Sequence, residues 1–232
     1  MKSTIMLGLL CVLSTSVHAQ SDSNTPAWNE QIIKDFSKNS RSVEFSVGYL
    51  SNQLTSNDND KIKSSGTGLR IGKTFNLSSD INTTTSLAGS YLTIKHDNNN
   101  LSEDFIVNGT ISEIGLSQRL SVDLGSSGTI VRPFVEVGVS RGLIATKYSG
   151  LDNFSADINY NKYVAAAGLQ IVFDNNIVPF VMFDYSKIKT DKNFHSQGSI
   201  DGESFSKDVA FETDSERKLS SQTLTIGIGF LF

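Results

Sequence analysis

The chain has 232 residues, which suits one or two domains, and it combines 18 glycines with only 3 prolines. Its net charge of −4, with lysines and acidic residues interspersed, argues against nucleic acid as a partner. The one cysteine, Cys11, lies in an apolar N-terminal segment, so the rest of the chain has no thiol for a disulfide or for nucleophilic chemistry.

Residues 1–19 have the pattern of a secretory signal peptide. Lys2 precedes an apolar run over residues 5–13, and residues 17–19 place small or β-branched side chains where a signal peptidase reads. The apolar run is shorter than the roughly 18 residues of a spanning helix. We therefore predict export through a cleaved signal peptide, with Gln20 as the first residue of the mature chain.

From residue 42 onward, apolar residues alternate with small or polar ones in the period of two that is typical of β-strands. The stretch from Leu224 to Phe232 shows this most clearly, because every second residue is large and apolar. An apolar strand at a chain end needs a stabilising environment on its outer face, and lipid is one such environment. The last strand of a soluble sandwich is the alternative for this segment.

The same alternation predicts eight strands. In the fourth, the apolar residues change parity between Ile111 and Ile114, which predicts a β-bulge. The predicted strands cover about residues 43–49, 68–77, 81–95, 103–124, 131–140, 162–173, 177–186 and 219–232.

The connections between these strands alternate in length. The short ones are 78–80, 125–128 and 174–176, and the long polar ones are 51–65, 96–102, 145–157 and 187–218. Short periplasmic turns and long extracellular loops are typical of transmembrane barrels. A soluble barrel such as a lipocalin has no reason to sort its loops by length, and it would turn its polar face outward. The sequence therefore predicts an all-β, eight-stranded antiparallel transmembrane β-barrel over residues 42–232.

Three segments, 72–76, 132–135 and 224–232, also carry a family resemblance. Through them the chain resembles the small eight-stranded bacterial outer-membrane barrels, a group that includes the OmpA transmembrane domain, the OmpX/Ail type and opacity-like porin-family surface proteins. The resemblance implies residence in the outer membrane of a Gram-negative bacterium. It also implies contact with outer-membrane lipid and lipopolysaccharide, and recognition of the C-terminal strand by the barrel-assembly machinery.

Residues 20–41 precede the predicted barrel and are mostly polar. Trp28, Ile32 and Phe36 are spaced four apart, which places them on one face of about two helical turns. So short a helix is marginal by itself. We predict a periplasmic segment, with a short amphipathic helix that folds weakly against the barrel rim. A lumen plug or a partner-binding helix is the alternative.

Charged residues fall on the strand faces opposite the apolar ones. Side chains just fill the interior of an eight-stranded barrel, so we predict a packed polar core of charge-assisted hydrogen bonds. A gated ion path is the alternative. In the hairpin centred on Ser126-Ser127, we predict one internal ladder, with Arg119 diagonal to Glu136 and Arg132 diagonal to Asp123. The predicted lumen network is Glu44, Arg70, Glu113, Arg119, Asp123, Arg132, Glu136, Lys162 and Asp184.

Enzymes are known among barrels of this size, and a hydrolase would need a nucleophile, a base and an orienting group close together. The nearest candidates, His195-Ser196 and His96-Asp97, lie in or beside predicted polar loops, where a histidine is normally solvated. Two mature histidines without cysteine do not make a zinc site of the usual type. We expect no catalytic, cofactor or metal site.

Two functional classes remain. A surface protein would act through its loops in envelope integrity or in adhesion and host contact, whereas a narrow porin would pass small solutes. The first is favoured because the interior is predicted to be filled while the loops are long and hydrophilic. The largest, residues 187–218, either extends the last hairpin outward as strands or forms a solvated loop.

Overall fold

The computed structural model describes residues 42–56, 61–98, 105–125, 129–149, 153–200, 203–213 and 217–232. The predicted signal peptide and the predicted helix within residues 20–41 lie outside the described residues. No helix in the described part of the chain is long and apolar enough to cross a membrane.

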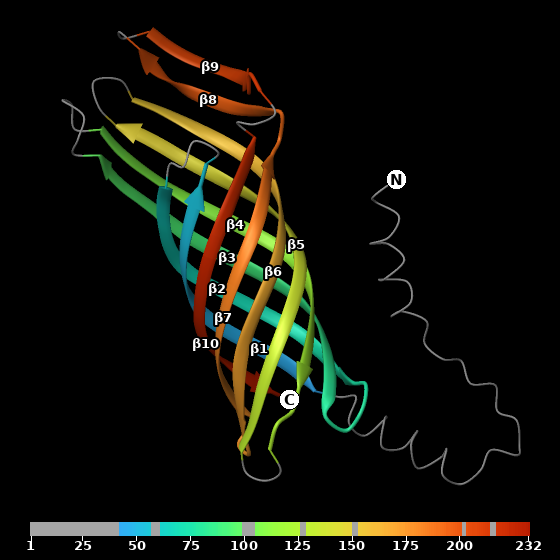
Figure 1. Ribbon diagram of the computed structural model, residues 1–232. Coiled ribbons are helices and arrows are strands. Elements are labelled where there is room, and N and C mark those ends of the chain that lie inside the picture. Colours follow the sequence, from blue (N-terminus) through green and yellow to red (C-terminus); the bar gives the residue numbers. More distant parts are fainter. Residues whose placement is uncertain are drawn as a thin grey trace, which may run out of the picture. The chain divides into compact units, whose positions relative to one another are not determined.

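The described residues form ten strands in one antiparallel sheet (Figure 1). They are β1 (Val43–Thr55), β2 (Lys61–Asn76), β3 (Ile81–Asn98), β4 (Phe105–Val122), β5 (Thr129–Ser149), β6 (Asn153–Phe173), β7 (Ile177–Thr190), β8 (Asn193–Ile200), β9 (Glu203–Ala210) and β10 (Lys218–Leu231). Pairing of β5 with β6, and of β1 with β10, closes eight of them into a barrel. The predicted eight-stranded antiparallel barrel is confirmed.

The C-terminus lies at the end of the barrel with the short connections. Leu231 donates its amide to the carbonyl of Asn176, which is part of the turn between β6 and β7. In transmembrane barrels the end with short turns faces the periplasm. The opposite end is therefore the extracellular one.

At the extracellular end, β8 and β9 form a hairpin that continues the path of β7. β8 pairs with residues Asn153–Asp157 of β6, beyond the point where β7 ends, and β9 pairs with β8. Figure 1 shows this hairpin, in orange and red, at the end of the barrel away from the C-terminus. Of the two predictions for residues 187–218, outward strands are confirmed.

Other strands also extend further than the sequence predicted. β1 and β2 take up most of residues 51–65, and β5 and β6 take up most of 145–157. These extensions keep the strand alternation, but outward positions carry small or polar residues, such as Ser51, Lys63 and Asp157, in place of large apolar residues. A strand in water needs only hydrogen bonds to its neighbours and one packed face. Strand pairing therefore continues beyond the point where the outward residues cease to be apolar.

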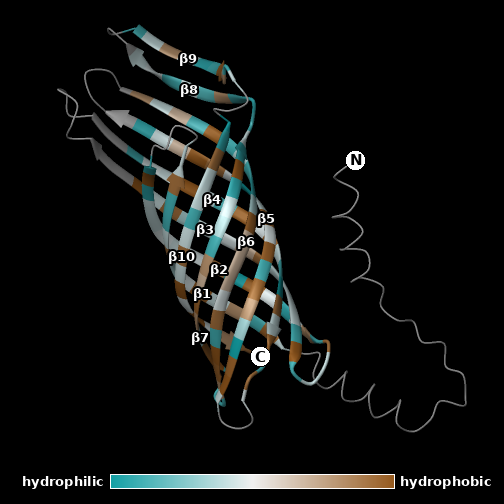
Figure 2. Cartoon of the chain, viewed as in Figure 1, coloured by the Kyte–Doolittle hydropathy of each residue, from teal (hydrophilic) through white to brown (hydrophobic). Residues whose placement is uncertain are grey.

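Large apolar side chains cover the outer wall of the barrel. Leu69, Ile114 and Val135, for example, are each more than half exposed although they belong to central parts of strands. Figure 2 shows apolar residues concentrated toward the end with the C-terminus and hydrophilic residues more frequent near β8 and β9. An outer wall of this kind requires lipid, because soluble proteins rarely expose so large an apolar surface.

Four tyrosines mark the extracellular limit of this apolar belt. Tyr49, Tyr91, Tyr163 and Tyr185 point outward and are 44–56% exposed. The next outward residue on each strand toward the extracellular end is polar, namely Ser51, Thr93, Asn161 and Lys187. Tyrosine is enriched where a transmembrane barrel meets the membrane–water interface. The four tyrosines therefore show at which height along the strands the extracellular membrane–water interface lies.

The predicted β-bulge in β4 is wrong. β4 pairs with β3 in one unbroken register from Phe105 to Val122. Ile111 and Ile114 simply face opposite sides, since Ile111 is buried in the lumen and Ile114 is exposed on the outer wall. The parity change arises because the lumen is apolar, not polar, at the level of Ile111.

Glycines make room for aromatic rings inside the barrel. Phe134 pairs across the strands with Gly168, and Tyr160 pairs with Gly142. A Cβ atom on either glycine would overlap the opposite ring. The small interior of an eight-stranded barrel can therefore hold large side chains only where the facing residue has none.

Replacing Gly168 by valine is expected to lower the free energy of unfolding by about 1–3 kcal/mol, as overpacking does. The new side chain would overlap the ring of Phe134 and the backbone oxygen of Val181. The measurement is the urea midpoint of unfolding in detergent. Gly229→Ala is the control, because its Cβ would lie no closer than 3.4 Å to the nearest atoms. Equal midpoints for wild type and Gly168→Val would contradict the packing described here.

Candidate functional site

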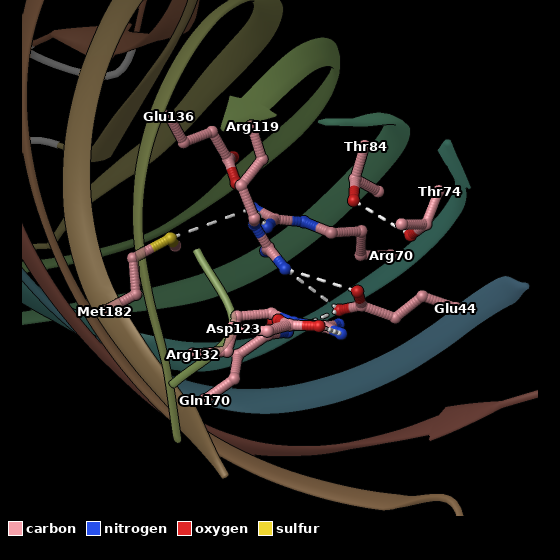
Figure 3. A network of polar contacts seen from close by, with 10 residues as sticks. All are labelled: Glu44, Arg70, Thr74, Thr84, Arg119, Asp123, Arg132, Glu136, Gln170 and Met182. Carbon is pink, nitrogen blue, oxygen red and sulfur yellow. Dashed lines mark hydrogen bonds and ion pairs between the residues drawn. The ribbon is translucent and has the colours of Figure 1, made fainter. Parts of the chain in front are cut away.

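Four charged residues meet in the middle of the lumen, and Figure 3 shows them pointing toward one another from different strands. Arg119 on β4 donates to Glu44 on β1 at 3.1 Å and to Glu136 on β5 at 3.0 Å. Glu136 also accepts a hydrogen bond from Arg70 on β2 at 2.7 Å. Gln170 on β6 donates to Glu44 at 3.0 Å. This central ion cluster of Glu44, Arg70, Arg119 and Glu136 ties four strands together, and Gln170 adds a fifth.

Apolar groups pack against the central ion cluster. The guanidinium of Arg119 lies over the ring of Phe134, 4.3 Å from its centroid. Arg70 contacts the sulfur of Met182 at 3.9 Å (Figure 3). The two arginines and two glutamates balance in charge, and the Arg119 and Glu136 side chains are only 2–3% exposed. Removing one partner would therefore leave an uncompensated buried charge.

A second ion pair lies nearer the periplasmic end. Arg132 donates from Nε and Nη2 to the two oxygens of Asp123, at 2.5 and 3.0 Å. Both predicted ion pairs of the ladder, Arg119 with Glu136 and Arg132 with Asp123, are present, although no described contact joins one pair to the other. The predicted diagonal placement is wrong, because Arg119 lies directly opposite Glu136. The turn is centred one residue later than predicted, which shifts every pair by two positions.

A third cluster lies on the extracellular side of the central one. Lys162 on β6 donates to both oxygens of Glu113 on β4 at 3.2 Å. The hydroxyl of Tyr160 donates to the same carboxylate at 2.5 Å. Lys162 and Glu113 were predicted in the network. Tyr160 was missed because it lies between the predicted loop 145–157 and the predicted strand 162–173, whereas β6 already begins at Asn153.

Asp184 lies between these clusters and lines a cavity of about 120 Å³. One of its carboxylate oxygens, and the hydroxyls of Ser140 and Thr225, face this cavity without a hydrogen-bond partner among the described residues. Buried polar atoms of this kind are normally satisfied by water, and the volume suits about four molecules. We refer to this cavity as the chamber; its lining is mainly apolar, and Asp184, Ser140 and Thr225 contribute polar groups to it.

An apolar layer crosses the lumen on the extracellular side of the chamber. It consists of the buried residues Leu54, Leu92, Ile94, Ile111, Ile144, Tyr160 and Ile188. The inward residues of β4 give the order of the layers from the periplasmic toward the extracellular end. Arg119 belongs to the central ion cluster, Gly115 lines the chamber, Glu113 pairs with Lys162, and Ile111 belongs to the apolar layer. The sequence prediction of a polar lumen missed this layer. The sequence feature that could have indicated this layer is the set of isoleucines at inward positions on the extracellular side of the tyrosines.

All nine predicted lumen residues face the interior, but they do not form one network. The structure divides them into the central ion cluster, the Asp123–Arg132 pair, the Glu113–Lys162 pair and Asp184. Their role remains a proposal, and the arrangement supports a structural one.

On the β8–β9 hairpin, His195 contacts Asp208 through Nδ1 at 3.0 Å and Ser206 through Nε2 at 3.3 Å. This is the order of groups in a serine-hydrolase relay. The sequence analysis paired His195 with Ser196 as a catalytic candidate, but the Ser196 side chain is buried on the opposite face of β8. Because the His195 and Asp208 side chains are 45% and 74% exposed, water screens the contacts strongly. We therefore interpret the three residues as cross-strand contacts that stabilise the hairpin.

The second histidine candidate of the sequence analysis, His96 with Asp97, lies on β3, but the side chains of both residues lie outside what the structure describes. Among the described residues, no group of three or more histidine, cysteine, aspartate or glutamate side chains could hold a metal ion.

Comparison with solved structures relates the chain to outer-membrane barrels at low sequence identity. Neisserial surface protein A is 12% identical with a TM-score of 0.50, over 83% of this chain and 99% of that one. A major outer membrane protein from Thermus thermophilus is 15% identical with a TM-score of 0.49, over 82% and 99%. The attachment invasion locus protein Ail of Yersinia pestis is 16% identical with a TM-score of 0.46, over 82% and 98%.

No protein-family model matches the sequence, and no curated protein matches it significantly. The fold is that of the small eight-stranded outer-membrane β-barrels, as the sequence resemblance implied.

Replacing Glu136 by leucine is expected to destabilise the barrel by roughly 3 kcal/mol, because Arg70 and Arg119 would lose the carboxylate they share. The measurement is again the urea midpoint in detergent. Asp191→Leu is the control, since it removes an exposed ion pair with Arg141 and is expected to cost less than about 1 kcal/mol. An unchanged midpoint for Glu136→Leu would show that water already solvates the central ion cluster.

Proposed function

We propose that this chain is an outer-membrane surface protein that acts through its extracellular strands in envelope integrity or in adhesion and host contact. Its lumen has a structural role and passes no solutes. Export through the predicted signal peptide of residues 1–19, and recognition of β10 by the barrel-assembly machinery, belong to the same proposal.

Two layers of side chains that cross the lumen carry this proposal. The central ion cluster crosses the barrel at one level, and the apolar layer around Ile111 and Tyr160 crosses it at another. A solute would have to break buried ion pairs and also pass a layer of mainly apolar side chains.

The extracellular extension supports the second half of the proposal. Beyond the tyrosines, β3 to β6 continue and are joined by β8 and β9. Exposed side chains of several chemical types lie on the hairpin, including His195, Lys207 and Asp208. Binding residues usually lie on exposed segments that a rigid scaffold positions, and the barrel is such a scaffold.

A narrow porin is the second candidate. The chamber beside Asp184 favours it, because a channel would need polar side chains at this depth. Both layers of side chains would have to open for conduction. This candidate and the first differ in one observable, the conductance of a bilayer that contains the purified protein.

Deleting residues 193–214 is expected to leave barrel assembly intact and to reduce adherence of expressing cells to host surfaces. Among the described residues, the strands of the hairpin pair with the barrel through residues Asn153–Asp157 of β6. Residues 191–192 and 215–217 would then connect β7 to β10. This short connection is sufficient because the ends of the two strands already lie side by side, with Lys189 of β7 paired with Lys218 of β10. The measurements are the amount of protein in the outer-membrane fraction and the number of adherent cells.

Bilayer conductance separates the two candidate functions in the same experiment. We expect no large, stable conductance steps from the full-length protein or from the deletion variant. Such steps from the full-length protein would favour the porin. Failure of the deletion variant to assemble would show that the hairpin is needed for the barrel itself.

A further inference from the structure

The charges inside the barrel do not balance. The nine charged lumen residues include four cations and five anions, and each of the four cations contacts an acid other than Asp184. Asp184 itself makes no ion pair within the described part of the chain. This set of lumen residues therefore carries one negative charge without a counterpart.

The strands beside Asp184 bring no cation to it. Its side chain is buried, and its partners across the sheet are Thr223 on β10 and Ala166 on β6. The inward residues before and after it on β7 are Met182 and Ser186. A buried carboxylate without a compensating charge is costly, so a cation or a proton has to neutralise it.

Lys162 does not supply the missing charge. It lies close enough to Asp184 to interact electrostatically, but its ammonium donates to both oxygens of Glu113 at 3.2 Å. All three residues line the chamber. Two carboxylates there consequently share one ammonium, and the chamber is short of one positive charge.

The chamber offers oxygen atoms and space for an ion beside Asp184. One carboxylate oxygen of Asp184 and the hydroxyls of Ser140 and Thr225 have no hydrogen-bond partner among the described residues, and all three residues line this cavity of about 120 Å³. Such a volume holds one small ion together with a few water molecules. Hard cations prefer oxygen ligands of this kind. A proton would neutralise Asp184 but would leave both hydroxyl oxygens to water alone.

We propose that the chamber binds one small monovalent cation, such as Na⁺, against Asp184. The ion contacts the unpartnered carboxylate oxygen, and the hydroxyl oxygens of Ser140 and Thr225 complete its shell together with water. A single uncompensated carboxylate balances one positive charge, which favours a monovalent ion over Mg²⁺ or Ca²⁺. The ion is a structural component of the lumen, like the ion pairs around it, and is not a conducted solute.

The test measures whether folding takes up the ion. Purified full-length protein in detergent is unfolded with urea at constant ionic strength, while Na⁺ replaces N-methyl-D-glucamine, an organic cation too large for the chamber. An ion that binds only the folded state raises the folding equilibrium constant in proportion to its concentration, once this is well above the dissociation constant. We expect about a tenfold rise for each tenfold increase in Na⁺ with wild type, and no rise with Asp184→Asn.

The matched control is Asp191→Asn. It is the same substitution and removes the same charge, but Asp191 is 37% exposed and pairs with Arg141 outside the lumen. We expect this variant to keep the Na⁺ dependence of wild type. Loss of the dependence in both variants would overturn the site, because the effect would then belong to the overall charge of the protein.

Wild type alone is sufficient to contradict the proposal. A folding equilibrium that does not respond to Na⁺ at pH 8 would overturn it, whether or not the variants assemble. Stability that rises as the pH falls, without any dependence on Na⁺, would show that a proton neutralises Asp184 in place of an ion. We expect Asp184→Asn to be at least as stable as wild type in N-methyl-D-glucamine, because a neutral amide needs no counter-ion, and a less stable variant would contradict the uncompensated charge.

Discussion

A strand that crosses lipid must satisfy all its backbone hydrogen bonds within the protein, because hydrocarbon offers no partners. In this chain the pairing of β1 with β10, from Glu44–Leu231 to Thr55–Ser220, completes the ring. Once the ring is closed, alternate side chains must face either lipid or lumen. The apolar belt and the inward charges both follow from this constraint.

Closure also creates the problem of filling a narrow interior. The barrel solves it with three kinds of contact, which are ion pairs, aromatic rings packed on glycines, and an apolar layer toward the extracellular end. Buried ions are costly without partners, and here Arg119 and Glu136 each contact two oppositely charged groups. The same contacts that stabilise the wall also fill much of the space inside it.

Period-two patterning predicted the features that depend on one strand at a time. Outward Tyr163 and inward Arg119 follow from parity alone, and the length of the connections predicted the orientation. Features that depend on several strands were not predicted. Arg70 and Glu136 are 66 residues apart in the sequence. They meet because the closed sheet brings β2 and β5 to face each other across the lumen, and no local sequence pattern encodes this.

Two errors have a physical cause of the same kind. Ile111 was assigned to a bulge because a membrane barrel was assumed to be polar inside, yet the interior beyond the tyrosines packs like a soluble core. Strand ends near residues 55 and 149 were missed because pairing in water continues without apolar outward residues. The pattern therefore showed where the membrane ends but not where the strands end.

The most direct test of a closed transmembrane barrel is its gel migration in detergent with and without boiling, alongside fractionation of expressing cells. A closed barrel held by its backbone ring and central ion cluster should resist detergent until heated. We predict a heat-dependent shift in migration for protein recovered from the outer-membrane fraction. Identical migration of both samples, from a protein that remains soluble without detergent, would contradict the account.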